Sequence, residues 1–554
     1  MAITVFKGDD MSDSETPLLN DDVVPGSVDF KCRPSVRSKS GSWKSASLLI
    51  GVEIAERFWY SGISSNLIGY LTGALGQSTA AAAANLNVWF GTATLSPIVG
   101  AFVADSFLGR YWTIIFSSLL YIMGLGFLTI SASLNLSSYS DCKSAGIDAP
   151  CSPPPFQKIF FFFSLYLIAI VVGGHTPCMQ SFGADQFDVE DKKECVAKSS
   201  FFNWWVMLSC SGSLLGYLIM NYIQENLSWE LGFGIPCIVM CFSLIIFLLG
   251  TKTYRFPINN DERRNPFVRI SRIIMRAARS CRLPFIAPIS NEQEVERNLP
   301  LRCIGDNEEV NLVFRLAPIW FTSLGYAVVF AQPTTLFTKQ AATVDRHISS
   351  TIQIPAATFQ SFIVGSIVVF IPFYDRIFVP IARAITKKPS GISMLQRIGT
   401  GIFLSLVSIV VAALVEKKRL AVAAENGMVD MPNAIVPMSV WWLVPQYMIS
   451  GIADVFTMAG LQEFFYDQVP SALKATGIAL YISVLGIGNF LSSFLIFLVE
   501  KATRGNGRDG WFADNLNRAH LDYFYWLLAG ISAFSFAAYV YYAKSYIYIR
   551  GLTV

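Results

Sequence analysis

The sequence predicts an all-α polytopic membrane protein with twelve transmembrane helices, from its composition, its recurring apolar stretches and the placement of its basic residues. Of its 554 residues, 53% are hydrophobic and only 15% are charged. The mean hydropathy is +0.47, which is too apolar for a soluble chain of this length. A net charge of +3 gives no indication of a nucleic-acid partner. Lipid is therefore the expected environment of most of the chain.

Apolar stretches that are long enough to cross a bilayer recur along the chain, since a hydrocarbon core of about 30 Å needs about 20 such residues per helix. The predicted spans cover residues 45–73, 83–108, 112–134, 157–180, 201–223, 230–251, 312–337, 353–374, 391–415, 437–465, 472–499 and 521–546. An even number of spans returns both termini to one side of the membrane.

The basic residues predict that both termini are cytosolic, because Lys and Arg in short loops are retained in the cytoplasm. Two segments on that side, 252–302 and 376–388, are rich in Lys and Arg, whereas the loop at 224–230 has neither. The loop at 415–436 disagrees, because three consecutive basic residues from Lys417 fall on the predicted outer face.

The polar N-terminal tail has no cleavable signal peptide, so the first span is expected to serve as an uncleaved signal. The tail carries Glu15 shortly before Leu18 and Leu19, which resembles an acidic dileucine sorting signal. This pattern favours the vacuolar membrane over the plasma membrane.

A hydrophilic stretch of about sixty residues divides the chain into two halves of six helices each. The predicted parts are a cytosolic tail (1–44), an N-terminal bundle (45–251), a cytosolic linker (252–311), a C-terminal bundle (312–546) and a cytosolic tail (547–554). This is the layout of a major-facilitator-type transporter, in which the substrate site lies midway between the bundles.

The linker contains arginines at helical spacing with apolar residues between them, which predicts an amphipathic basic helix. Those arginines are Arg269, Arg272, Arg276 and Arg279. The helix either lies along the anionic cytosolic leaflet and braces the two halves, or docks a regulatory protein.

Cysteine and histidine usage gives no indication of an enzyme or of a metal or other cofactor. Cys142 and Cys151 lie in a predicted outer loop, where they either form a disulfide or remain free thiols. The three histidines lie in separate segments and match no metal-ligand spacing. The expected partners are protons, a small-molecule solute and membrane lipid, and the expected state is a monomer or weak dimer.

Three ionisable residues inside the first span are the strongest chemical signal. Glu53, Glu56 and Arg57 stand at i, i+3 and i+4, which places both carboxylates and the guanidinium on one helix face. Ionisable groups at membrane depth cost several kcal/mol each and usually face a cavity and work. Two carboxylates that share one arginine predict reversible proton binding. A permanently closed ion-pair cluster is the structural alternative.

The run from Glu53 to Gly62, EIAERFWYSG, closely resembles the ExxERFxYYG signature of the proton-coupled oligopeptide transporters and of their plant branch, the nitrate and peptide transporter family. Further matches begin at Gly100 (GAFVADSFLGRY), Phe182 (FGADQFD) and Tyr374 (YDR). The resemblance covers about residues 45–546 and implies a plant source, a fold of two six-helix bundles, and alternating access.

The resemblance also implies roles for single residues. Glu53, Glu56 and Arg57 match the proton-coupling cluster, and Glu463 matches the acidic group of the tenth helix. Residues at matching or neighbouring positions are expected to line the substrate cavity, namely Tyr60, His175, Thr176, Phe330, Gln332 and Thr334. Charges at cytosolic helix ends are interpreted as gate or latch residues, namely Asp105, Arg110, Asp375 and Arg376.

The chain departs from the family in its fourth helix, where a GGxKPC run reads Gly-Gly-His175-Thr176-Pro-Cys. Thr176 takes the place of the usual lysine, so Glu463 loses its usual partner and is expected to be neutral over more of the cycle or to pair with Arg57. His175 lies about 100° round the helix from Thr176. It is either a packed, hydrogen-bonded histidine or a titrating group near the cavity.

Phe330 stands where some nitrate-transporting relatives have a histidine, and Ala331 where peptide-transporting relatives have a glutamate. Phe330 either makes the cavity wall more apolar or packs against a neighbouring helix. The expected function is proton symport of nitrate or of small organic solutes such as di- and tripeptides. Transport of hormones or specialised metabolites, a proton-independent facilitator and a sensor remain as alternatives.

Overall fold

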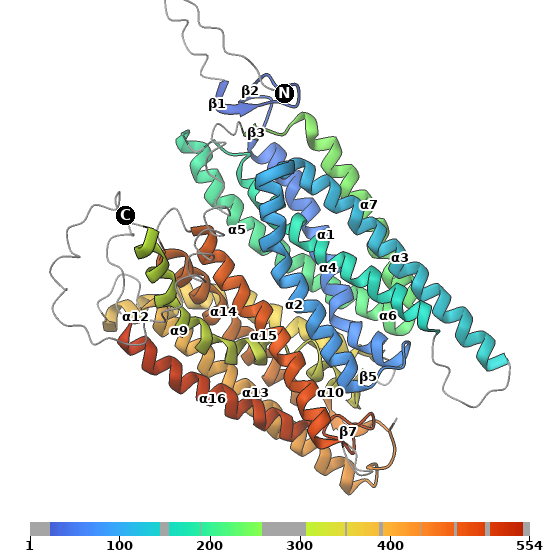
Figure 1. The fold of residues 1–554 in the computed structure, drawn as a ribbon. Coiled ribbons are helices and arrows are strands. Elements are labelled where there is room, and N and C mark those ends of the chain that lie inside the picture. Colours follow the sequence, from blue (N-terminus) through green and yellow to red (C-terminus); the bar gives the residue numbers. More distant parts are fainter. Residues whose placement is uncertain are drawn as a thin grey trace, which may run out of the picture.

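The computed structural model is almost entirely helical (Figure 1). The structure describes residues 23–144, 154–188, 190–257, 306–349, 352–386, 392–432, 434–469, 474–504 and 510–546. Within these ranges, nine helical segments are long and apolar enough to cross a membrane. Three more, α1 (Ser42–Gly73), α9 (Asp306–Phe330) and α14 (Val444–Asp467), complete the predicted set of spans. Ionisable residues in α1 and α14 lower the hydropathy of these two helices.

The first half of the chain forms one group of helices, drawn in blue to green in Figure 1. After α1 come α2 (Thr79–Val103), α3 (Arg110–Ser144), α4 (Pro155–Ala184), α5 (Lys192–Leu215), α6 (Asn221–Asn226) and α7 (Trp229–Leu249). Short π-helical turns, η1 (Ala104–Leu108) and η2 (Gly216–Met220), end α2 and join α5 to α6. Ser78, Asp191 and Ser228 cap the starts of α2, α5 and α7.

The second half forms a second group of helices, drawn in yellow-green to red. After α9 come α10 (Leu336–Ala342), α11 (Ser361–Phe373), α12 (Val379–Thr386), α13 (Met394–Glu425), α14, α15 (Lys474–Thr503) and α16 (Leu521–Ser545). Two small sheets lie between these helices, β4 (Val344–Asp345) with β7 (Val436–Ser439), and β5 (His347–Ser349) with β6 (Ile352–Gln353).

The seventh span ends earlier than predicted, at Phe330 rather than at residue 337. Pro333 has no backbone N–H and disfavours helical geometry in the residue before it, so the helix stops short of it. The chain turns and resumes as α10. The tenth span likewise starts late, because residues 436–439 form β7 rather than helix.

Helix α13 runs about ten residues beyond its predicted end, and this extension accounts for the basic residues on the outer face. Arg419 is almost fully buried and donates to both carboxylate oxygens of Glu416, at 2.6 and 2.9 Å. It also donates to Asn517. The Lys418 ammonium lies 3.2 Å from the centre of the Trp442 ring. Arg419 and Lys418 are therefore bound by protein groups within or beside helix α13, which agrees with their presence on the predicted outer face.

The end of the N-terminal tail is folded against the first bundle, which the sequence did not predict. Strands β1 (Val23–Val28), β2 (Pro34–Val36) and β3 (Phe256–Pro257) form one antiparallel sheet that joins the tail to the start of the linker. Beside it, the buried Arg255 donates to Glu194 at 2.6 and 3.1 Å and to the Ser40 carbonyl at 2.7 Å. The tail is thus fastened to the end predicted to be cytosolic.

Hydrogen bonds between the two helix groups lie in the half of the molecule predicted to face outward, among the residues described. Lys339 donates to Thr72 at 3.1 Å, Gln360 to the Ser65 carbonyl at 3.0 Å, and Asn87 on α2 to Ser492 on α15 at 3.0 Å. An ion pair at 2.9 Å joins Arg346 to Glu225. The two groups are therefore closed on one another at their outer ends.

Two predicted features lie outside the described residues. Cys142 belongs to the backbone of α3, but its side chain and Cys151 are not among the residues described, so the disulfide stays a prediction. The same holds for the basic helix predicted around Arg269.

Gly41 provides a test of the fastened tail. It has a φ of +75°, and an added Cβ would lie 2.1 Å from Nε of Arg255, whose side chain is held by Glu194. Gly41→Ala is therefore expected to lower the thermal unfolding temperature in detergent, through backbone strain of about 1–3 kcal/mol plus the clash. Gly26→Ala is the control, because Gly26 also has a positive φ but no neighbour within 4 Å. Equal losses in the two variants would contradict the packing of Gly41 on Arg255.

Candidate functional site

The carboxylate of Glu56 lies where α1, α3 and α4 meet, and it receives hydrogen bonds from both other helices. Nδ1 of His175 lies 2.6 Å from Oε2 of Glu56. The Thr176 hydroxyl donates to Oε1 at 2.8 Å, and the Tyr121 hydroxyl lies 3.3 Å from the same oxygen. Glu56 is 3% exposed and His175 is fully buried. Three donors suit a carboxylate that accepts hydrogen bonds, rather than a carboxylic acid that must donate one.

Glu53 has a different set of partners, one turn earlier on the same helix. Nε of Arg57 donates to its Oε1 at 2.7 Å, and the Ser209 hydroxyl of α5 donates to the same oxygen at 3.2 Å. Oε2 of Glu53 is buried without a partner among the described residues. The prediction that the two carboxylates share Arg57 is therefore corrected: Arg57 is hydrogen-bonded to Glu53, whereas Glu56 is paired with His175.

Small residues in α4 bring His175 into the interior of the bundle. A Cβ on Gly173 would lie 2.2 Å from the Ser96 carbonyl oxygen of α2, and a Cβ on Gly174 would lie 2.6 Å from the Ser117 hydroxyl of α3. The two glycines thus let α2 and α3 pack directly against the backbone of α4, as small residues do in membrane helix packing. The next two residues, His175 and Thr176, are held against α1 as a result.

Aromatic rings surround the buried acids. The Tyr121 ring meets the rings of Trp59 and His175 edge to face, with centroids 4.9 and 5.4 Å apart. The Tyr60 ring is half-buried and stacks on Trp89 at 5.8 Å. These rings cover Glu56 on the side of α3, and the carboxylate is 3% exposed.

Arg57 is the most accessible member of the group, with 34% of its side chain exposed. Its Nε is bonded to Glu53, and its two terminal nitrogens make no hydrogen bond within the described part of the chain. A guanidinium presents these two nitrogens in a planar fork that matches a carboxylate or another planar anion. Arg57 is therefore arranged to bind an anion while remaining paired with Glu53.

Glu463 is not in the environment expected for it. It is 46% exposed in its side chain, and its nearest cation is Arg397 in the first turn of α13, at 3.5 Å. The expected pairing with Arg57 is absent from this conformation, and the carboxylate is not buried. The sequence argument considered only the missing lysine of the fourth helix and overlooked Arg397, which the neighbouring helix supplies.

Of the residues expected to line the cavity wall in the second bundle, one is fully buried and two are half-buried. Gln332 is fully buried and bonds to Ser492 of α15 at 3.0 Å, so its amide joins two helices. Thr334 is half-buried. Phe330 is half-buried beside Asp454, whose carboxylate accepts a 2.7 Å hydrogen bond from Tyr326. Asp454 thus makes a bond between α14 and α9.

The predicted gate charges are only partly described. Arg110 forms an ion pair with Asp185, which links the start of α3 to the end of α4 at the predicted cytosolic face. Arg376 is exposed in the π-helical turn η6 (Tyr374–Phe378). The side chains of Asp105 and Asp375 lie outside the described residues.

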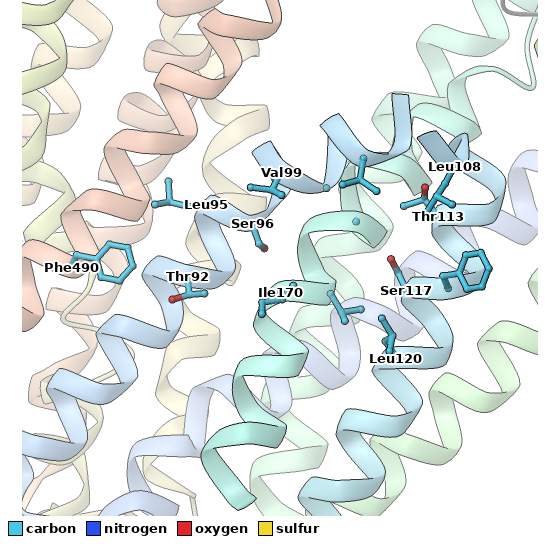
Figure 2. Close-up of a pocket in the computed structure, with 15 residues that line it drawn as sticks. Thr92, Leu95, Ser96, Val99, Leu108, Thr113, Ser117, Leu120, Ile170 and Phe490 are labelled. Atoms are coloured by element: carbon cyan, nitrogen blue, oxygen red, sulfur yellow. The ribbon is translucent and has the colours of Figure 1, made fainter. Parts of the chain in front are cut away.

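A groove of about 540 Å³ is lined by α2, α3 and α4 and by Phe490 of α15 (Figure 2). Glu53 and Glu56 are not among its lining residues. Val99, Ile170 and Leu120 on its rim are exposed, and Leu120 belongs to an apolar face of α3 that also includes Phe116 and Met123. Such a face within a membrane span borders lipid. The groove is therefore expected to hold hydrocarbon chains and not the transported solute.

Sequence reasoning missed three residues of the site, namely Tyr121, Ser209 and Arg397. Tyr121 and Ser209 lie in largely apolar stretches that contain other hydroxyl residues, such as Ser118 and Ser211. Their spacing along the chain does not indicate which helices become neighbours. The weak signal in each case is that a polar group at membrane depth needs a partner.

Comparisons with known proteins agree with this architecture. Residues 111–512 match the model of the POT family. Among curated relatives, Arabidopsis thaliana NRT1/PTR family 5.10 is 57% identical over 97% of this chain and 98% of its own, and NRT1/PTR family 5.12 is 52% identical over 97% and 99%.

Solved structures show the same fold at low sequence identity. The crystal structure of an auto-inhibited POT family peptide transporter superposes with a TM-score of 0.68 at 21% identity, covering 91% of this chain and 98% of that one. The POT family transporter PepTSo gives 0.66 at 20% identity, covering 90% and 98%. The chain therefore belongs to the POT family of proton-coupled transporters, in its NRT1/PTR group, and is a multi-pass membrane transporter rather than an enzyme.

Proposed function

We propose that this protein is a proton symporter that carries nitrate or small organic solutes, such as di- and tripeptides, across a plant cell membrane by alternating access. The observation that carries this proposal is the pair of buried carboxylates in α1. Glu53 and Glu56 are 1% and 3% exposed, yet among the described residues only one fixed cation, Arg57, is bonded to them. A buried site with more acids than fixed cations is relieved by taking up a proton.

The solute class is argued from Arg57. Its terminal nitrogens are unoccupied by described residues, and nitrate and the carboxylate of a peptide are both planar anions that can accept two parallel hydrogen bonds. An anion bound there would lie beside Glu53, so its charge would favour protonation of the neighbouring acids. Binding of solute and binding of proton would then support one another, as symport requires.

Alternating access is supported by the interactions that close the outer ends of the bundles. Arg346 follows β4 in the second half, and Glu225 lies in α6 of the first half, so their ion pair must break when the outer ends separate. Glu225 also accepts a hydrogen bond from the Ala356 backbone at 3.2 Å. These contacts form an outer gate that is shut in this conformation. The acidic dileucine in the tail favours the vacuolar membrane as the site of transport.

Replacing Glu56 tests the proton site. Uptake of nitrate, a dipeptide and a small hormone panel would be measured at acidic and neutral outside pH in cells with matched surface abundance. Glu56→Gln is expected to abolish acid-stimulated uptake, because it removes one of the two buried negative charges that favour proton uptake at the site. Glu463→Gln is the control: it is expected to lower uptake less than about fivefold, since an exposed ion pair contributes about 0–1 kcal/mol.

The two variants separate the possible outcomes. Uptake that is independent of pH and survives in Glu56→Gln would mean that the cluster is structural and the protein a facilitator. Loss of uptake in Glu463→Gln alone would transfer the coupling role to α14. Acid-stimulated uptake of hormones but not of nitrate or the dipeptide would replace the proposed solutes with larger amphipathic ones.

Charge reversal tests the outer gate. Glu225→Arg and Arg346→Glu each place like charges together, which weakens the closed state, so each is expected to slow uptake at constant surface abundance. The double reversal restores opposite charges and should recover most of the rate. Asp430→Arg is the control, because Asp430 pairs with Arg518 at 2.7 Å within the second bundle and crosses no gate. A double reversal as slow as the single ones would exclude this pair as a gate.

A further inference from the structure

The contact between His175 and Glu56 joins a titratable ring to a buried acid. In a lysine-bearing relative of the kind described above, this position of α4 would supply a cation that is always charged. Here Thr176 supplies only a hydroxyl, at 2.8 Å from Glu56, and the neighbouring imidazole lies at 2.6 Å from the other carboxylate oxygen. The only nitrogen that faces Glu56 at hydrogen-bond distance among the described residues is therefore one whose charge depends on protonation.

The second ring nitrogen of His175, Nε2, makes no hydrogen bond to a described residue. A carboxylate accepts hydrogen bonds, so Nδ1 of His175 carries the hydrogen that points at Glu56. Nε2 is buried and has no hydrogen-bond partner among the described residues. In the neutral ring, Nε2 holds a lone pair, and an unpaired buried acceptor is unfavourable. Nε2 is thus an acceptor without a donor, inside the protein and next to a negative charge.

The charges of the group balance when one more proton is bound. With Glu53 and Glu56 ionised, Arg57 charged and the His175 ring neutral, the four side chains carry a net charge of −1. A proton on Nε2 makes His175 an imidazolium and brings the group to zero. Because three of these side chains are at most 3% exposed, the neutral arrangement is the one that burial favours.

Other titratable groups around the ring do not provide that charge. The phenols Tyr60, Tyr121 and Tyr217, from α1, α3 and η2, are neutral at physiological pH, as is the thiol of Cys210 on α5. From α1, the charged groups are the two acids and Arg57, and Arg57 is bonded to Glu53. Thr176 is the only other side chain of α4 that contacts Glu56.

We infer that His175 is a proton-binding residue of the transport cycle: Nε2 takes up one proton while Nδ1–H stays bonded to Glu56, which converts the anionic Glu56–His175 pair into a neutral ion pair. The proton comes from the solution that the open side of the transporter admits, and it returns to the solution on the other side. This inference rests on the proposed symport. It assigns the proton to His175 of α4. Arg57, while bonded to Glu53, then remains available to bind the solute.

The experiment follows His175 directly, by NMR of the full-length protein labelled at the histidine rings. The chain contains only three histidines, so three ring signals are expected, and His175→Gln assigns one of them. As the pH is lowered from about 8 to about 5, the His175 ring is expected to change from the neutral form with unprotonated Nε2 to the imidazolium. A ring that keeps one protonation state over this range overturns the inference, whichever variants fold.

Variants of the partners show whether Glu56 controls the ring. Glu56→Gln removes the charge that stabilises the imidazolium and is expected to move the His175 titration midpoint. Thr176→Val removes one hydroxyl and no charge, so it should move the midpoint less. The ring signals of His347 and His520 serve as internal references in both variants, since His347 pairs with Asp345 and His520 stacks on Tyr523 in the other half of the chain. An unmoved midpoint in Glu56→Gln would overturn the pairing.

Uptake separates this inference from the function on which it rests. His175→Gln is expected to lose acid-stimulated uptake of whichever panel solute the wild type carries. Acid-stimulated uptake that persists in His175→Gln overturns the role of His175 and leaves symport intact. Absence of acid stimulation in the wild type itself would instead refute symport, whatever the NMR signals of the histidine rings show.

Discussion

Every ionisable group inside the lipid-surrounded bundles needs a partner, and this requirement organises much of the structure. Burial removes a carboxylate from bulk water, and the three buried carboxylates Glu53, Glu56 and Asp454 are each met by donors from the protein. Glu53 has Arg57 and Ser209, Glu56 has His175 and Thr176, and Asp454 has Tyr326. These bonds tie α1 to α4 and α5, and α14 to α9. The same buried charges therefore help to hold these helices against one another.

Much of the fold could be predicted from the sequence because a membrane leaves few choices. Apolar runs of about 20 residues have to be spanning helices, and the class and order of the helices follow from them. The predictions failed at helix ends. Pro333 stops α9 seven residues early, whereas α13 continues past the bilayer because Glu416 and Arg419 find a buried site against Asn517. The first kind of end is encoded locally, and the second depends on residues about a hundred positions away.

The charged residues of α1 in the candidate site were predictable from the sequence, but their partners Tyr121 and Ser209 and the pairing of the acids were not. Helical spacing placed Glu53, Glu56 and Arg57 on one face, and hydropathy placed that face inside the membrane. Spacing alone suggested that His175 could not replace a cation at position 176, since the two residues point about 100° apart on their helix. In the structure both reach Glu56, because its two oxygens lie between them. The pairing of Glu56 with His175 depends on how closely α4 packs against the other helices, which Gly173 and Gly174 permit. Residue spacing within one helix does not contain this information.

The buried pair at the outer end of α13 has a consequence for how the chain enters the membrane. Insertion machinery meets Lys417, Lys418 and Arg419 before the later helices exist, and basic residues resist translocation. Glu416 is three residues from Arg419, so their ion pair can form within the nascent helix itself. Trp442 and Asn517 emerge only later. An ion pair within one helix needs no later helix in order to offset the charge of Arg419, so this part of the site can form before the bundle does.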